Sequence, residues 1–480
     1  MSTPKKNFIY NIIYQMLILI IPLILSPYLS RSLGANGIGI YSYKYSIVYY
    51  FMLFTLFGIN NYGNRSIAKA RDNKENLSKT FLSIYIFQLI MGLIMLIIYL
   101  TYIFVFDVSY KNIALILSLF ILSSILDINW FFFGLEEFKK TITRNIIIKI
   151  INLILIFIFV KKPNDVWKYA LIMSIMTCLS QLILWKFLKK KITFAKITKK
   201  DILMHIKPNL TLFIPVIAVS LYKMMDKVMI GYLINPKEVG FYENAEKIIS
   251  IPLAFTTALG TVMLPRVSNL LVKGEKDKIK RYIGNSIKFV MFLSLPMCMG
   301  LISIGYNFAP IYFGNEFQKT GILIILLSVT LPFVSFANIL RTQYLIPNEM
   351  DKIYIKSVIL GAIINLILNF VFIPGLKSIG ACIGTIAAEF TVYFIQMFEL
   401  RKDLDIKKYH VSAVPFLLKA IVMFLIIYPL NYINCNNIIK IILQIGVGTI
   451  IYFTLNVKYI MTIIDIKKIL IKLKIKSEVI

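Results

Sequence analysis

The sequence predicts an all-α integral membrane protein with about 14 transmembrane helices and both termini in the cytoplasm. Of its 480 residues, 58% are hydrophobic and 16% are charged. A soluble domain is typically about a quarter charged, so this composition excludes a water-soluble globular protein. The 53 Lys and Arg residues against 23 Asp and Glu residues give a net charge of +30. These basic residues alternate with long apolar runs and form no soluble basic surface, which argues against nucleic acid as a partner.

Apolar stretches long enough to cross a bilayer, about 20 residues each, recur along the whole chain. The first follows Lys5 and Lys6 as in a signal peptide, but it is too long and no small-residue cleavage site follows it, so we predict a span. The connections are short, and the longest, at 188–208, is a Lys-rich amphipathic stretch. The predicted spans lie near residues 8–29, 43–63, 80–106, 112–134, 142–160, 165–187, 209–234, 241–265, 283–313, 320–346, 353–373, 379–400, 411–432 and 438–457.

The distribution of basic residues predicts the orientation of the chain, because Lys and Arg collect in cytoplasmic loops near span ends. With the N-terminus placed inside, the inner segments hold 37 basic residues and the outer segments hold nine. Both termini are therefore predicted to lie in the cytoplasm. The remaining seven basic residues are lysines within the spans. A charge there costs about 2.5 to 3.5 kcal/mol, so these lysines are the first candidates for function.

An internal repeat divides the predicted spans. The stretch LGANGIGIYSYKYSI, from Leu33 to Ile47, aligns at an offset of 201 with INPKEVGFYENAEKI, from Ile234 to Ile248. The segment NLIL at 152–155 recurs at 365–368, an offset of 213. We therefore predict two six-span lobes, related by an axis normal to the membrane, as in many transporters. The N-terminal lobe is residues 1–200, the C-terminal lobe is 201–408, and spans 13 and 14 with a basic cytoplasmic tail occupy 409–480.

Three short motifs lie between Pro27 and Arg71. They are a Tyr-Leu-x-Arg turn at 28–31, LG-x-x-G-x-G-x-Y at 33–41 and G-x-x-x-Y-G-x-R at 58–65. This region resembles the opening of the bacterial polysaccharide transporters, the Wzx-type flippases of lipid-linked oligosaccharides. These belong to the multidrug/oligosaccharidyl-lipid/polysaccharide exporter superfamily. The stretch YLINPKEVGFYENAEKI resembles what such proteins carry at spans seven and eight.

The resemblance implies a carrier rather than an enzyme, working by alternating access in a bacterial cytoplasmic membrane. Its two lobes would enclose a cationic cavity, and its substrate would be an oligosaccharide repeat unit attached by pyrophosphate to undecaprenol. Spans 13 and 14 would help to form a groove for the lipid tail. The implied partners are membrane lipids and the polymerase and chain-length proteins of the same pathway. No cofactor is implied, and a proton or sodium gradient would drive transport.

Spans seven and eight carry charged residues at helical spacing, so that the charges on each helix share one face. They are Lys223, Asp226 and Lys227 in span seven, and Glu243, Glu246 and Lys247 in span eight. The hairpin between the spans brings opposite charges together. Two interpretations stay open: an ion-pair network that only stabilises the second lobe, or a cavity lining. In the second, Lys223 or Lys227 binds the pyrophosphate and an acidic residue couples to an ion.

Other candidates stand alone, either within the spans or close to their ends. Lys149 lies about 12 Å into span five at 1.5 Å per residue, which favours exposure to a cavity over packing beside a carboxylate. Arg31 and Arg65 lie near helix ends, where long basic side chains usually reach the interface, but both belong to the motifs of the resemblance. Asp127 in span four and Glu389 in span twelve are isolated carboxylates. Each could serve as an ion-coupling site, and each could equally well pair with a lysine or lie at a hydrated helix end.

Three other functions fit the sequence less well. A multidrug exporter of the same superfamily would present acidic residues to cationic drugs, whereas the lysines within the spans favour an anion. A lipid II flippase is closer, but its opening motif normally differs from LG-x-x-G-x-G-x-Y. A polysaccharide polymerase or ligase would need a large external loop, and none of the predicted external loops is long enough. The sequence also contains no GxxxxGK[ST] stretch that would indicate direct use of ATP. The repeat and the lysines within the spans fit a carrier for an anion, and the resemblance implies export of a lipid-linked oligosaccharide for capsular or O-antigen-type surface polysaccharide.

Overall fold

The computed structural model describes residues 4–106, 109–189 and 191–463, and all the regular structure in these ranges is helical. Nine of the described helices are long and apolar enough to cross a membrane, and ten if one bent pair is counted as a single span. The predicted class, a helical membrane protein, is confirmed at this level. Three further helices, of 53, 28 and 37 residues, cover predicted spans one, seven and eight and most of span two. The total of 14 spans and the orientation stay predictions.

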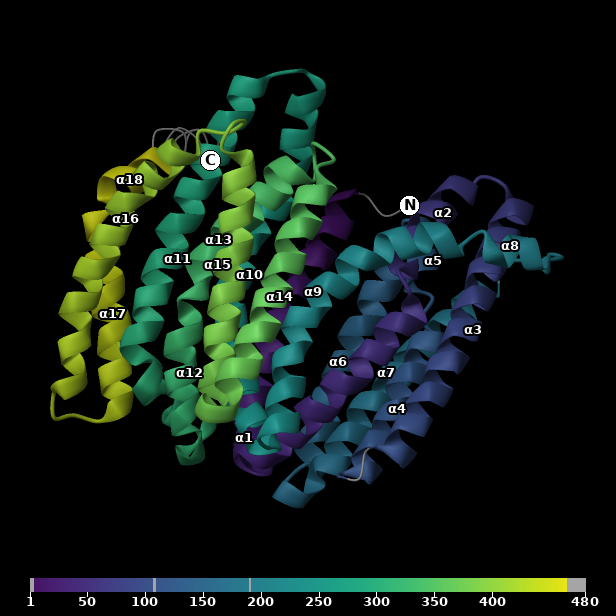
Figure 1. Ribbon diagram of the computed structural model, residues 1–480, viewed down its shortest axis with the longest axis horizontal. Helices are drawn as coiled ribbons and strands as arrows, with labels where there is room; N and C mark the ends of the chain where they lie inside the picture. Colours follow the sequence, from purple (N-terminus) through teal and green to yellow (C-terminus); the bar gives the residue numbers. More distant parts are fainter. Residues whose placement is uncertain (1–3, 107–108, 190, 464–480) are drawn as a thin grey trace, which may run out of the picture. The chain divides into compact units, whose positions relative to one another are not determined.

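The chain forms two compact units. Unit 1 comprises Met1–Lys247 and Val358–Ala388, and unit 2 comprises Ile248–Ser357 and Glu389–Ile480. This partition follows contacts rather than the repeat, so the predicted six-span lobes stay a prediction. The helices are α1 (Pro4–Leu56), α2 (Ile59–Ala70), α3 (Lys74–Val105), α4 (Lys111–Ile125), α5 (Asn129–Gly134), α6 (Phe138–Phe159), α7 (Val166–Leu188), α8 (Lys199–Leu203), α9 (Ile206–Leu233), α10 (Pro236–Val272), α11 (Lys276–Phe313), α12 (Gln318–Ser328), α13 (Thr330–Leu340), α14 (Asp351–Leu376), α15 (Ser378–Leu400), α16 (Ile406–Ile427), α17 (Asn437–Leu455) and α18 (Val457–Ile463) (Figure 1).

Unit 1 contains two breaks that matter for the site. Predicted span one and most of span two run together in α1, which is interrupted only at Gly34, where φ is 68°, and the end of span two lies in α2 beyond Gly58. Glycine has no Cβ and tolerates this left-handed conformation at little cost. Predicted span four is also divided, into α4 and α5, with Asp127 at the break. The buried indole of Trp130 anchors α5 by donating a hydrogen bond of 3.0 Å to the Gln88 side chain of α3.

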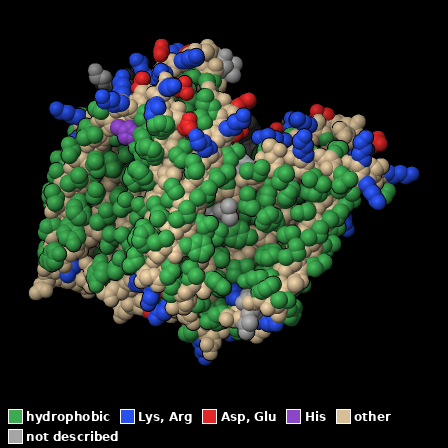
Figure 2. Space-filling model, viewed as in Figure 1, with side chains coloured by type: hydrophobic (Ala, Val, Ile, Leu, Met, Phe, Trp, Pro, Cys, Tyr) green, Lys and Arg blue, Asp and Glu red, His purple; other side chains and the backbone are tan. Residues whose placement is uncertain are grey.

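In unit 2, the long helix α11 supports α16 and α17, which cover predicted spans 13 and 14. The Tyr452 hydroxyl donates a hydrogen bond of 2.9 Å to the Phe292 carbonyl. Phe292 also packs edge-on against Phe416, with 5.8 Å between ring centroids. On the face drawn in Figure 2, hydrophobic side chains cover the middle of the helices and Lys and Arg side chains gather towards the helix ends. This is the arrangement expected of helices that cross a bilayer.

Candidate functional site

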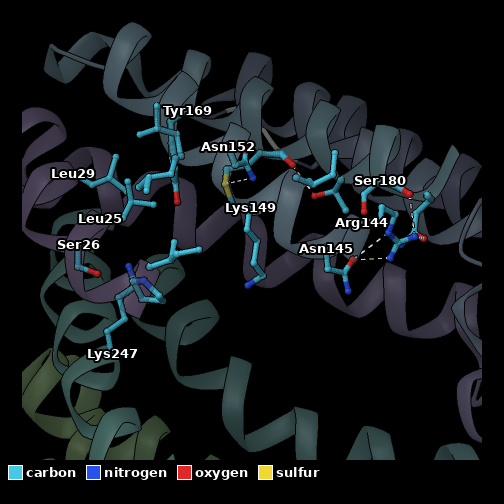
Figure 3. Close-up of a pocket in the computed structure, with 18 of the residues that line it drawn as sticks. Leu25, Ser26, Leu29, Arg144, Asn145, Lys149, Asn152, Tyr169, Ser180 and Lys247 are labelled. Carbon is cyan, nitrogen blue, oxygen red and sulfur yellow. Dashed lines mark hydrogen bonds between the residues drawn. The ribbon is translucent and has the colours of Figure 1, made fainter. Parts of the chain in front are cut away.

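A cavity of about 490 Å³ lies inside unit 1, between α1, α6 and α7. The residues of α1 that line the cavity are mostly apolar, whereas α6 and α7 contribute amide and hydroxyl groups. Figure 3 shows Lys149 of α6 extending into the open space, and Lys247 of α10 at another side of it. The polar lining residues are Ser26, Asn129, Arg144, Asn145, Lys149, Asn152, Tyr169, Thr177, Ser180, Gln181 and Lys247.

Arg144 is a cavity residue whose guanidinium is held by three helices. It donates hydrogen bonds to Asn145 Oδ1 on α6 at 2.6 Å, to Asn129 Oδ1 on α5 at 2.9 Å and to the Ser180 carbonyl on α7 at 3.0 Å. Hydrogen bonds between neutral groups and a cation are stronger than those between neutral partners. Arg144 therefore fixes the shape of one end of the cavity while adding positive charge to its wall.

A second cluster, the ion-pair network, joins α9 to α10. The Lys227 ammonium lies 3.0 Å from a Glu243 carboxylate oxygen and 3.1 Å from a Glu246 oxygen. Glu243 also pairs with Lys247 at 3.3 Å. The four groups carry two charges of each sign, so the network is neutral overall. Because Lys247 belongs to both the network and the cavity lining, the two features are physically continuous.

The carboxylate of Asp226, next to Lys227 on α9, has different surroundings. It accepts hydrogen bonds of 2.6 Å from the Tyr242 hydroxyl and the Asn369 amide, and a third from the Thr385 hydroxyl. Asn369 in turn donates to Asn365 Oδ1 at 3.2 Å. Every partner of Asp226 among the described residues is therefore neutral. Asn369 Oδ1 and Asn365 Nδ2 are buried and have no hydrogen-bond partner in the described part of the chain.

Comparisons with known proteins identify the family of this chain. A model of the polysaccharide biosynthesis protein family matches residues 5–271, more than half of the sequence. The chain belongs to this family. A MatE family model also matches residues 212–371, as expected for a member of the multidrug/oligosaccharidyl-lipid/polysaccharide exporter superfamily.

Relatives of this chain cover most of its length. The putative O-antigen transporter of Escherichia coli K12 is 24% identical over 415 residues, 83% of this chain and 97% of the relative. That of Shigella dysenteriae is 26% identical over 402 residues, 83% and 99% of the two chains. Among solved structures, the lipid II flippase MurJ in an inward closed conformation matches with a TM-score of 0.77 at 17% identity, covering 95% and 99% of the two chains. That likeness shows a shared fold.

The remaining predicted site residues of this family member lie outside the cavity and the ion-pair network. Arg31 of α1 and Arg65 of α2 are exposed. Glu389 is half-buried in α15, and the side chain of Lys223 lies outside the described residues. Asp127 accepts a hydrogen bond of 2.8 Å from the Asn129 backbone N–H and one of 2.6 Å from the Asn129 side chain. This carboxylate therefore caps α5 and orients an amide that holds Arg144.

Sequence reasoning missed the neutral residues of the cavity and of the Asp226 cluster. This cluster consists of Asp226 with Tyr242, Asn365, Asn369 and Thr385. One signal was available: the repeated NLIL segments begin with Asn152, which lines the cavity, and Asn365, which belongs to the Asp226 cluster. Arg144, which is 5% exposed, is likewise absent from the predicted site residues. Its partners come from three helices, and such a meeting has no local sequence pattern.

Proposed function

We propose that this protein is a flippase that moves undecaprenyl-pyrophosphate-linked oligosaccharides from the inner to the outer leaflet of a bacterial cytoplasmic membrane. The observation that carries the proposal is the cavity of unit 1, in which Lys149, Lys247 and Arg144 lie among amides and hydroxyls. Cationic groups in a low-dielectric site favour an anion such as pyrophosphate. Amides and hydroxyls supply the donors and acceptors that sugar hydroxyls require. The relatives named O-antigen transporters support this substrate class.

Contacts between the two copies of the repeat support a two-lobe carrier. A Cβ on Gly39 would lie 1.6 Å from the Pro236 carbonyl oxygen, and a Cβ on Gly240 would lie 2.0 Å from that of Ala35. At the offset of 201, Gly39 corresponds to Gly240 and Ala35 to Pro236, so the two contacts are the same with the copies exchanged. Such exchange is the signature of a two-fold interface. In the predicted orientation these contacts lie at the outer end and favour a cavity that opens first to the cytoplasm.

The Asp226 cluster suits the coupling ion. A buried carboxylate without a cationic partner is costly, unless it is protonated or binds a cation. Na⁺ takes oxygen ligands, and Asp226, Asn365, Asn369 and Thr385 all carry side-chain oxygens at this point. Either a proton on Asp226 or a sodium ion among these oxygens would link transport to a gradient, and the charge of the site would then change during each cycle.

Two other functions are weaker on the same geometry. A multidrug exporter for cationic drugs would need acidic groups, and none of the described residues that line the cavity is Asp or Glu. A lipid II flippase would share the fold and the anionic head group, so the glycan alone separates it from the proposed function. The substrate assay below must therefore compare both lipids.

The test is transport by the purified chain in proteoliposomes loaded with a fluorescent undecaprenyl-pyrophosphate oligosaccharide or with lipid II. We expect Lys149→Gln to lower the initial rate of oligosaccharide flipping at least tenfold, because the cavity loses a charge that faces the pyrophosphate. Lys149→Arg should restore most of the rate. Lys288→Gln removes a lysine of α11 that does not line the cavity and serves as the control. Equal rates in Lys149→Gln and the wild type would refute the proposed site, and transport of lipid II alone would refute the substrate.

A further inference from the structure

A second hollow, of about 1210 Å³, lies in unit 2 where α15 ends and α16 begins. The function proposed above makes no use of it. In the predicted orientation the connection at 401–408 is cytoplasmic, so the hollow opens at the inner leaflet. Its lining residues are Phe390, Tyr393, Phe394, Met397, Phe398, Arg401, Leu404, Asp405, Ile406, Lys407, Lys408, His410 and Val411.

One wall of the hollow is a row of aromatic rings on α15. Phe390, Phe394 and Phe398 repeat every four residues and are 45%, 45% and 47% exposed. Successive ring centroids are 6.1 Å apart, and neighbouring planes differ by 23° and 24°. In the predicted orientation this row gives an apolar track that runs along α15 from the membrane interior to the cytoplasmic mouth of the hollow. A hydrocarbon chain lying on such a track would bury apolar surface and be stabilised by the hydrophobic effect.

The mouth of the hollow is basic. The Arg401 guanidinium lies 3.6 Å from the centroid of the Phe398 ring, so the last ring of the track holds a cation above it. Lys407 and Lys408 line the same mouth, against Asp405 as the single acid of the described lining. The His410 ring is anchored between the Tyr393 hydroxyl and the Ile406 carbonyl, and its contact with that carbonyl is 2.8 Å. The balance of charge favours an anion.

The chemistry of this lining differs from that of the cavity in unit 1. No Asn, Gln, Ser or Thr is among the described residues that line the hollow. A glycan would find few groups to bind there, whereas a phosphate joined to a hydrocarbon chain would match both the basic mouth and the aromatic track. Basic pockets between transmembrane helices at the cytoplasmic side are known to suit anionic lipid head groups.

We propose that this hollow binds an anionic glycerophospholipid of the inner leaflet, with its phosphate at Arg401, Lys407 and Lys408 and an acyl chain along Phe390, Phe394 and Phe398. The lipid joins the end of α15 to the start of α16. Because α16 packs on α11 through Phe416 and Phe292, the bound lipid stabilises unit 2. The proposal concerns a resident lipid rather than the transported one.

The experiment measures lipid binding to the purified full chain by native mass spectrometry, with phosphatidylglycerol and phosphatidylcholine of the same acyl chains as probes. We expect phosphatidylglycerol to bind at least tenfold more tightly and to raise the melting temperature. The triple variant Arg401→Gln, Lys407→Gln, Lys408→Gln should lose this preference. A charge-matched control, Lys273→Gln, Lys276→Gln, Lys402→Gln, removes exposed basic residues of unit 2 that do not line the hollow, and it should keep the preference.

Equal binding of the two lipids, or an unchanged preference in the triple variant, would overturn the proposal. Displacement of phosphatidylglycerol by undecaprenyl phosphate at equimolar concentration would also overturn it, since the occupant would then be the substrate lipid. If the triple variant does not fold, Arg401→Gln alone should still lower the affinity at least threefold. Phe394→Ala should weaken binding of long-chain phosphatidylglycerol and leave a short-chain form unaffected, which checks the track separately from the mouth.

Discussion

Asp226 and Lys227 are neighbours on α9, yet their buried charges have opposite surroundings. Lys227 is balanced by two carboxylates at 3.0 and 3.1 Å, and a second lysine completes a neutral network. Asp226 is surrounded by hydroxyls and amides, and no cation contacts it in the described part of the chain. A balanced network can persist unchanged through a transport cycle, whereas an unbalanced carboxylate changes its free energy whenever a cation arrives. From this comparison we propose a scaffold role for Lys227 and a coupling role for Asp226.

The largest effect should come from breaking the balanced network. Lys227→Met leaves Glu243 and Glu246 buried with one lysine between them, and removing one partner of a buried pair typically costs about 3 to 5 kcal/mol. We expect membrane abundance to fall severalfold and the melting temperature of the purified protein to drop. Glu243→Gln added to Lys227→Met restores the charge balance and should recover part of both quantities in a double-mutant cycle.

One outcome for Lys227→Met would contradict the proposed scaffold role of Lys227. If flipping is lost while abundance and melting temperature stay at wild-type values, then Lys227 binds substrate and the scaffold interpretation is wrong. This measurement also decides between the two interpretations of spans seven and eight that the sequence left open.

Asp226→Asn should have the converse effect, with a large loss of transport and a small change in stability. The amide keeps the size of the side chain and can still hydrogen-bond with Tyr242 and Thr385, but it carries no charge for a proton or a sodium ion. We expect a loss of at least tenfold in gradient-driven flipping, at wild-type abundance. Wild-type dependence on sodium at fixed pH, or on pH without sodium, identifies the ion. Gradient-driven flipping at the wild-type rate in Asp226→Asn would rule out a coupling role.

The sequence predicted the charges of these clusters better than their neutral partners. Helical spacing placed Lys227, Glu243 and Lys247 on facing sides of a hairpin, because charge is rare inside a span and its period is easy to see. Two of the partners of Asp226, Asn369 and Thr385, come from α14 and α15, more than 130 residues away, and Asn and Thr carry no such signal. The helical membrane class followed from composition alone. The break at Asp127 did not, because it depends on the packing of Trp130 and Arg144.

The smallest effect is expected where the same kind of pairing occurs outside the spans. Burial acts to raise the pKa of Glu137, between α5 and α6, but hydrogen bonds from Lys140 and Lys191 outweigh it and hold the pKa below its ordinary value. Such a partly exposed pair is worth about 1 kcal/mol or less, so Glu137→Gln should lower the melting temperature only slightly. In contrast to Lys227→Met, it should leave membrane abundance unchanged.

The pH dependence of that small contribution has a definite sign. The folded state holds the pKa of Glu137 below its unfolded value of about 4.3, so the unfolded chain binds the proton more readily. The contribution is complete above the unfolded pKa and is lost as the pH falls through the folded one. Melting curves of wild type and Glu137→Gln should therefore differ most near pH 7 and converge below pH 4. If the two melting temperatures still differ at low pH, Glu137 stabilises the fold through packing and not through its charge. Glu137 and the ion-pair network could then not be compared as two charge pairs that differ in burial.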